Sequence, residues 1–231
     1  MKTLKVTIAS CFLALAFASV AGAQAGPMAG AMGPMPRGLF NPVVGSGAQY
    51  EVQPNGKDKM TVEIDVVGKE SVNGKDGYWF ETAFDSQMGQ MMMKMLMVSD
   101  GANSTIAKMI MQMAGGPPME MPAQMMGQRA AQQMADIRDK ADKVGSESVT
   151  TPAGTFTADH YRMKDGSGDF WLSEKVSPYG LIKGQGKDFN MVLTKVVTNA
   201  TDKITGTPVP FDPRLLMQGG AGGGPGGRRQ P

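Results

Sequence analysis

The sequence has very little of what disulfide frameworks, metal centres and most catalytic sites require, because one of its 231 residues is cysteine and one is histidine. Charged residues make up 19% of the chain, too few for a chain kept unfolded by its own charge. The 31 glycines follow no Gly-X-Y repeat, which excludes collagen. No apolar run beyond the N-terminus is long enough for an internal membrane span.

The N-terminus carries the three parts of a secretory signal peptide. Lys2 and Lys5 make a basic start, residues 8–20 form an apolar core, and Ala21-Gly22-Ala23 supplies the small residues of a cleavage site. The pattern predicts that residues 1–23 are removed during export.

Cleavage changes the chemistry of the chain. It removes Cys11, so the mature protein has no disulfide and rests on its core alone. It also removes two lysines and no acid, which leaves 21 basic and 21 acidic residues and a formal charge of zero. A neutral chain has no broad attraction for nucleic acid, so no such partner is expected. An exported protein of this size without cysteine is typical of a bacterial periplasm, where we expect it, with no transmembrane span after cleavage.

Composition divides the mature chain into three parts. Residues 24–46 are rich in glycine, proline and methionine and have no structural period, which predicts a disordered arm. Residues 214–231 form a glycine-rich tail that we also expect to be disordered. Residues 47–213 remain, and this length suits a single β-rich domain with a core of its own.

Alternating apolar and polar residues predict strands throughout that domain. The clearest case is 59–67, where Met60, Val62, Ile64 and Val66 alternate with polar residues. Asn-Gly pairs at 55–56 and 73–74 separate strands and favour hairpin turns. The predicted strands are 47–52, 59–67, 78–84, 91–98, 105–113, 147–150, 155–163, 169–173, 181–184 and 189–197, followed by an extended exit at 207–213.

One segment departs from this pattern. In residues 123–143 the apolar side chains recur every three or four residues, which predicts an amphipathic helix between Pro122 and Gly145. The members of the stripe are Met126, Ala130, Met134, Ile137 and Ala141. The predicted fold class is therefore mainly β (α+β), a curved antiparallel sheet or half-barrel with one amphipathic helix covering a face.

Methionine is the most unusual feature, since 14 of the 22 methionines lie between residues 88 and 134. Within residues 91–97 and 109–113, alternate methionines share one strand face. The register between the two strands stays open. A two-residue turn at Asp100-Gly101 pairs Met92 with Met109, whereas a longer turn near Asn103 sets Met95 opposite Met111.

Three interpretations of the methionines follow. Methionine fills irregular gaps in cores, so the cluster is explained by packing alone. Its flexible, polarisable side chain also suits an adaptable pocket for an apolar ligand. Thioethers select Cu(I), and Met88-x-x-Met91 or Met119-x-Met121 supplies such ligands, although copper sites often recruit imidazole or thiolate as well.

The sequence holds no recognisable catalytic or cofactor motif. It has no Gly-x-Ser-x-Gly elbow, no His-Glu-x-x-His, no phosphate-binding loop and no dinucleotide fingerprint. His160 follows Asp159 in a strand, and adjacent strand residues point to opposite faces, so Asp159 does not orient His160. We expect His160 to be a surface or edge histidine, and predict no enzyme activity, no catalytic residue and no cofactor.

Three strings resemble a known group of sequences. They are TPAGTF at 151–156 continuing to His-Tyr-Arg at 160–162, DFWLS at 169–173 followed by VSPYGLIK at 176–183, and MIM at 109–111 with PMEMP at 118–122. The strings are similar to a group of exported, uncharacterised bacterial proteins whose sheet resembles the half-barrel of the periplasmic lipoprotein carriers LolA and LolB. This likeness, over about residues 47–200, implies a curved sheet with a hydrophobic cavity for acyl chains. No ligand residue of the carriers can be matched.

The leading hypothesis is a non-enzymatic periplasmic protein that binds a lipid-like or other apolar ligand, or an apolar segment of an envelope protein, in a methionine-lined cavity. The alternatives are a copper(I)-handling protein and a purely structural envelope interaction module. The predicted lining residues are Met93, Met95, Met97, Met109, Met111, Met126 and Met134.

Overall fold

The computed structural model describes residues 39–54, 58–86, 89–100, 103–122, 137–187 and 189–212. All described residues belong to one unit of the chain, Pro34–Pro231.

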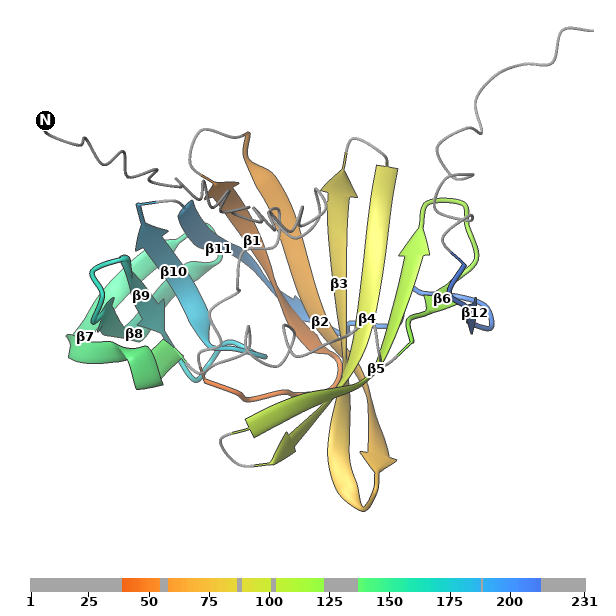
Figure 1. Ribbon diagram of the computed structural model, residues 1–231. Coiled ribbons are helices and arrows are strands. Elements are labelled where there is room, and N and C mark those ends of the chain that lie inside the picture. Colours follow the sequence, from red (N-terminus) through yellow and green to blue (C-terminus); the bar gives the residue numbers. More distant parts are fainter. Residues whose placement is uncertain are drawn as a thin grey trace, which may run out of the picture. The chain divides into compact units, whose positions relative to one another are not determined.

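Within the described residues, twelve strands form one sheet in the order β12-β6-β5-β4-β3-β2-β1-β11-β10-β9-β8-β7 (Figure 1). Neighbouring strands are antiparallel except β12 and β6, which are parallel. The bounds are β1 (Ser46–Pro54), β2 (Met60–Val72), β3 (Lys75–Ser86), β4 (Gly89–Asp100), β5 (Asn103–Met113), β6 (Met119–Glu120), β7 (Ala141–Thr151), β8 (Gly154–Met163), β9 (Gly168–Leu172), β10 (Leu181–Gly186), β11 (Phe189–Thr198) and β12 (Val209–Pro210).

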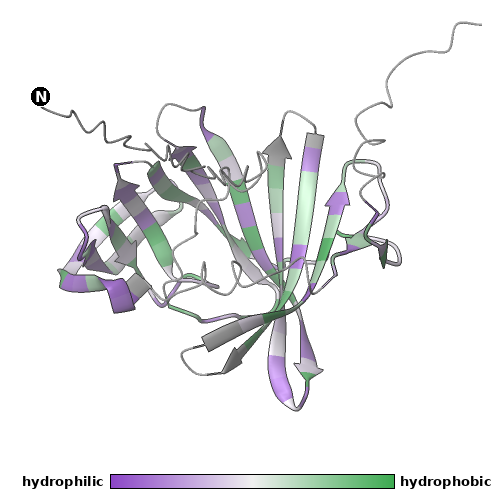
Figure 2. Ribbon diagram, viewed as in Figure 1, coloured by the Kyte–Doolittle hydropathy of each residue, from purple (hydrophilic) through white to green (hydrophobic). Residues whose placement is uncertain are grey.

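The alternating residues form these strands because one side of the sheet is apolar and buried. In β2, Val62, Ile64 and Val66 are at most 4% exposed, while Glu63 points to the other face. The same alternation of hydropathy runs along several strands in Figure 2. Between β2 and β3, Asn73 and Gly74 both adopt positive φ, which closes the predicted two-residue hairpin. The predicted strands are confirmed, and most are longer than predicted.

Aromatic contacts show that the sheet bends around its apolar face. Tyr179 lies in the connection between β9 and β10, yet its ring stacks on Phe80 of β3 with 5.7 Å between centroids. In sheet order β2, β1 and β11 separate β3 from β10, a distance of about 19 Å in a flat sheet. The part of the sheet between β3 and β10 therefore curves, and its apolar face is concave.

The core fills the inside of this bend. Phe40, which precedes β1, adds a third ring at 5.8 Å from Phe80, and the hydroxyl of Tyr50 donates to the carbonyl of Leu181. Phe40, which lies in the predicted arm at 24–46, thus packs against the core while remaining half-buried. Gly180 takes a φ of 71° beside Leu39, which makes the predicted Pro178-Tyr179-Gly180 corner possible.

The predicted helix is wrong in the part of 123–143 that the structure describes. Ile137–Lys140 forms one 3-10 turn, η1, and Ala141 already begins β7. Residues 123–136, with Met126, Ala130 and Met134, lie outside the described residues. Ala141 is the last residue of the predicted helical stripe, but in the structure it pairs with Met163 and is buried. It belongs to a strand because the ten residue pairs between β7 and β8 outweigh its helical spacing. The α+β class with one amphipathic helix is therefore corrected to a β-sheet protein.

Phe80 offers a test of the bent sheet. Its side chain is fully buried and packs against the rings of Phe40 and Tyr179. We expect Phe80→Ala to lower the free energy of unfolding by about 3–5 kcal/mol, measured by urea denaturation. Phe156→Ala, at a half-buried ring on β8, is the control and should cost less than about 2 kcal/mol. Equal losses in both variants would contradict the central role of Phe80.

Candidate functional site

Methionines of β4 and β5 face one another across the hairpin. Met91 pairs with Met113, Met93 with Met111 and Met95 with Met109. We call these six residues the methionine ladder. Their partners on β3 include Phe80, opposite Met95, and Phe84, opposite Met91, so the ladder continues the concave apolar face.

A bulge in β5 produces this pairing. Near the turn Met97 pairs with Ile106, but Leu96 already pairs with Lys108, so Ala107 has no partner on β4. Neither predicted register is correct, because Asp100 already pairs with Asn103 beside the turn and the bulge then shifts the pairing by one more residue. Without the extra residue, Lys108 would stand opposite Met95.

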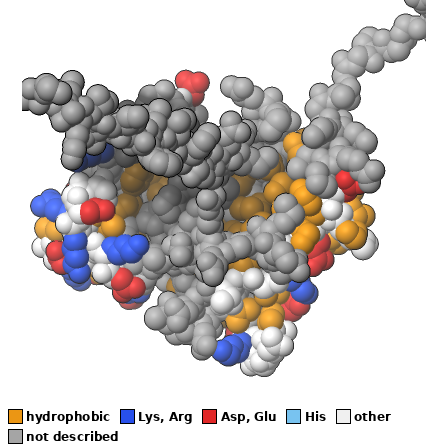
Figure 3. Space-filling model, in the orientation of Figure 1, with side chains coloured by type: hydrophobic (Ala, Val, Ile, Leu, Met, Phe, Trp, Pro, Cys, Tyr) orange, Lys and Arg blue, Asp and Glu red, His pale blue; other side chains and the backbone are white. Residues whose placement is uncertain are grey.

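The ladder is apolar without being fully buried. All six methionines are half-buried, whereas Phe80 is completely buried and Phe84 is 7% exposed. Met97, next along β4, is also completely buried, and the Tyr179 hydroxyl lies 3.6 Å from its sulfur. The ladder thus extends the apolar face beside the buried Phe80, Phe84 and Met97. Figure 3 shows hydrophobic side chains gathered where β3, β4 and β5 lie in Figure 1.

The structure brings together four of the predicted lining residues. Met93, Met95, Met109 and Met111 belong to the ladder, and Met97 lies at its inner end. Met126 and Met134 lie outside the described residues. Met91 and Met113 are not among the predicted lining residues, although they follow the same strand alternation. Their place in the ladder comes from the register of β4 and β5.

The copper-binding pairs are placed only in part. Met88 is outside the residues whose side chains are described, so Met88-x-x-Met91 stays a prediction. Met119 on β6 is 2% exposed, while Met121 is half-buried. Among the described residues no group of three or more His, Cys, Asp or Glu side chains is arranged to hold a metal ion.

No protein-family model matches the chain, and no curated protein matches it. The solved structures that are similar to the chain include two bacterial proteins. One is a "putative lipoprotein" from Parabacteroides distasonis, with 12% identity and a TM-score of 0.35 over 70% of this chain and 99% of that one. The other is a "putative exported protein with YmcC-like fold" from Bacteroides fragilis, with 13% identity and a TM-score of 0.34 over 69% and 99%. Likenesses at this level do not decide the function.

His160 belongs to a polar network on the opposite face. Its Nε2 lies 2.7 Å from Asp169 Oδ1, its ring stacks on Trp171 at 4.5 Å, and the Trp171 indole N–H donates to Glu147. Asp159, as predicted, does not orient it. Asp169 comes from the neighbouring strand through the pairing of β8 with β9, which no local pattern in the sequence indicates.

A second charged cluster lies under the segment that follows β11. Glu81 of β3 is 1% exposed and accepts hydrogen bonds from the backbone N–H groups of Lys203 and Ile204, at 3.1 and 3.2 Å. Asp65 of β2 lies beside it in register, and Lys203 donates to the Asp65 carboxylate at 2.7 Å. Gly47 makes room for this carboxylate, since a Cβ there would lie 2.1 Å from Asp65 Oδ1.

Burial decides the protonation of this cluster. Removal from water, with a smaller contribution from Asp202, raises the pKa of Glu81 to about 7. Burial also raises the pKa of Asp65 against the opposing effect of Lys203. Lys94 of β4 faces Glu81 in register and pairs with Asp202. These groups attach residues 202–204 to the sheet, which is a structural role.

The Glu81 pKa predicts a loss of stability as pH rises. A carboxyl group whose pKa is higher in the folded than in the unfolded state stabilises the fold while it is protonated. This stabilisation is fully present below about pH 4.5 and is lost as the pH rises through about 7. Relative to Glu81→Gln, the wild type should lose on the order of 3 kcal/mol of unfolding free energy across that range. Urea denaturation at a series of pH values measures it.

Glu174→Gln, at an exposed side chain, is the control and should follow the wild type. Parallel pH curves for the wild type and Glu81→Gln would show that Glu81 does not titrate in this range.

Proposed function

We propose that this is an exported, non-enzymatic protein that binds a lipid-like ligand, an acyl chain, along the methionine ladder. The single observation behind the proposal is that three directly opposed methionine pairs lie half-exposed on the concave face of the sheet. The signal-peptide pattern at residues 1–23 and the resemblance to lipoprotein carriers support the same function.

The ladder has the dimensions and chemistry that an acyl chain requires. From the row of Met91 to the row of Met95 the strand rises about 14 Å. Each methylene of a ligand buried there contributes about 0.8 kcal/mol. Methionine side chains adapt to the shape of a flexible chain, and Phe80 and Phe84 provide a rigid apolar border.

Alternation keeps charge away from this surface. Lys94 lies between the ladder residues of β4, and its ammonium contacts the Trp79 ring at 4.9 Å on the opposite face. The ladder residues therefore offer an acyl chain no charged group to desolvate. No helix in the described part of the chain has the length and apolar character to span a bilayer.

The first experiment measures displacement of a fluorescent fatty acid and analyses lipid extracted from the purified full-length protein. We expect binding by the wild type and at least about tenfold weaker binding by Met93→Gln/Met111→Gln, since losing about 1.4 kcal/mol is a tenfold change. Met163→Gln, on β8, should bind as the wild type does. Absence of both co-purified lipid and fatty-acid binding, or equal weakening in Met163→Gln, would overturn the proposal.

Copper(I) handling is a second candidate, favoured by the pairing itself. Two neighbouring rows, such as Met93 with Met111 and Met95 with Met109, bring four thioethers onto one face. Thioethers are soft ligands that select Cu(I) over harder metals. This arrangement of the four residues depends on the register of β4 and β5.

Replacing methionine by leucine separates the two functions, because leucine keeps the volume and apolarity but has no sulfur. If copper is the ligand, the wild type takes up Cu(I) in anaerobic titration against a competing chelator, and Met93→Leu/Met111→Leu loses it. If an acyl chain is the ligand, the same variant retains fatty-acid binding. Failure of the wild type to compete for Cu(I) would eliminate the copper candidate.

A further inference from the structure

The face opposite the methionine ladder carries two regular rows of side chains across five strands. Strand register sets Glu51 and Gln53 of β1 in line with neighbours on β11, β10, β9 and β8. We call these the upper row and the lower row. The upper row is His160, Trp171, Lys183, Val192 and Glu51, and the lower row is Arg162, Asp169, Gln185, Asn190 and Gln53.

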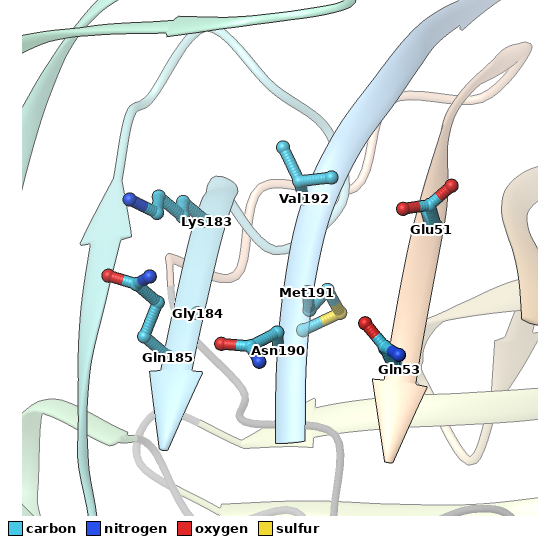
Figure 4. A pocket seen from close by; sticks show the side chains of 8 residues that line it. All are labelled: Glu51, Gln53, Lys183, Gly184, Gln185, Asn190, Met191 and Val192. Carbon is cyan, nitrogen blue, oxygen red and sulfur yellow. The ribbon is translucent and has the colours of Figure 1, made fainter. Parts of the chain in front are cut away.

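A shallow depression of about 140 Å³ lies where the rows cross β1, β10 and β11. Figure 4 shows side chains of both rows around it, with Lys183 and Gln185 on β10, Asn190 on β11, and Gln53 on β1. Gly184 and Met191 complete its lining, and Met191 is only 5% exposed.

Three carboxamides in the lower row are free to bind a ligand. Gln53, Asn190 and Gln185 are exposed neighbours on successive strands, spaced about 4.8 Å apart. None of the three side chains hydrogen-bonds to another described residue. Each carboxamide offers two N–H donors and an acceptor oxygen, so the row presents both donors and acceptors to solvent.

The charges around the depression compensate one another. Glu51 pairs with Lys59 at 2.7 Å, and Asp169 pairs with Arg162 at 3.0 Å. Lys183 lies over the Trp171 ring at 4.8 Å, and Glu147 accepts a hydrogen bond from the Trp171 indole. Three cations and three carboxylates therefore balance around the two rows, which provides no net attraction for an anionic or a cationic ligand.

From the amide row, the depression and the balanced charge, we propose that this face binds a neutral saccharide. Sugar hydroxyls both donate and accept hydrogen bonds, as carboxamides do, and adjacent hydroxyls on one ring reach two amides on neighbouring strands. A chain of sugars laid across the strands meets Gln185, Asn190 and Gln53 in turn. The site is on the opposite face from the methionine ladder, so it is independent of the acyl-chain proposal.

The experiment is an NMR titration of the full-length protein with maltohexaose, cellohexaose and chitohexaose, following side-chain amide signals. We expect saturable shifts of Gln53, Asn190 and Gln185 with at least one of these sugars, while the amide of Gln90 on β4 stays unchanged. Gln53→Ala/Asn190→Ala should raise the dissociation constant at least about tenfold, a loss of about 1.4 kcal/mol. The matched variant Gln90→Ala should bind as the wild type does.

Three results would overturn the proposal: no saturable shift with any of the sugars up to their solubility limits, unchanged binding in Gln53→Ala/Asn190→Ala, or saturable binding of a neutral alanine peptide instead of sugar. Because alanine at exposed strand positions removes no core contact, backbone NMR spectra of both variants should remain those of a folded chain. Fatty acid added to the saccharide complex should leave the amide shifts in place, which keeps the two sites distinguishable.

Discussion

The stacking of Tyr179 on Phe80 is the contact on which the rest of the structure depends. It joins the connection between β9 and β10 to β3, and a flat sheet would hold these elements far apart. Closing that distance makes the apolar face concave, and burial of several rings together stabilises the bend without any disulfide. The methionine ladder begins where this aromatic core ends.

Bending one sheet also separates two kinds of surface. Because side chains alternate along each strand, the concave face collects apolar residues, while the exposed part of the other face collects charged and amide residues. The buried carboxylates Glu81 and Asp65 are on the second face, yet residues 202–204 cover them there, so burial is not confined to the concave side. Methionine and carboxamide side chains thus present opposite chemistry from the same β-layer.

Much of this fold could be predicted from local pattern. The alternation in 59–67 and the Asn73-Gly74 pair correctly predicted β2 and its hairpin, because burial of one face and positive φ are local demands. The helix at 123–143 failed in its described part for a different reason. Cross-strand pairing with β8 outweighed the helical periodicity from Ala141 onward.

The sequence by itself determined which residues are apolar, where strands alternate, and that methionine concentrates in one pair of strands. Only the tertiary structure decided which side chains meet. The unpaired Ala107 shifts β5 by one residue and sets methionine, instead of Lys108, opposite Met95. The pairing of His160 with Asp169, and the alignment of Gln53 with Asn190, come likewise from register. Register is a property of two strands packed together, so neither strand's sequence alone specifies it.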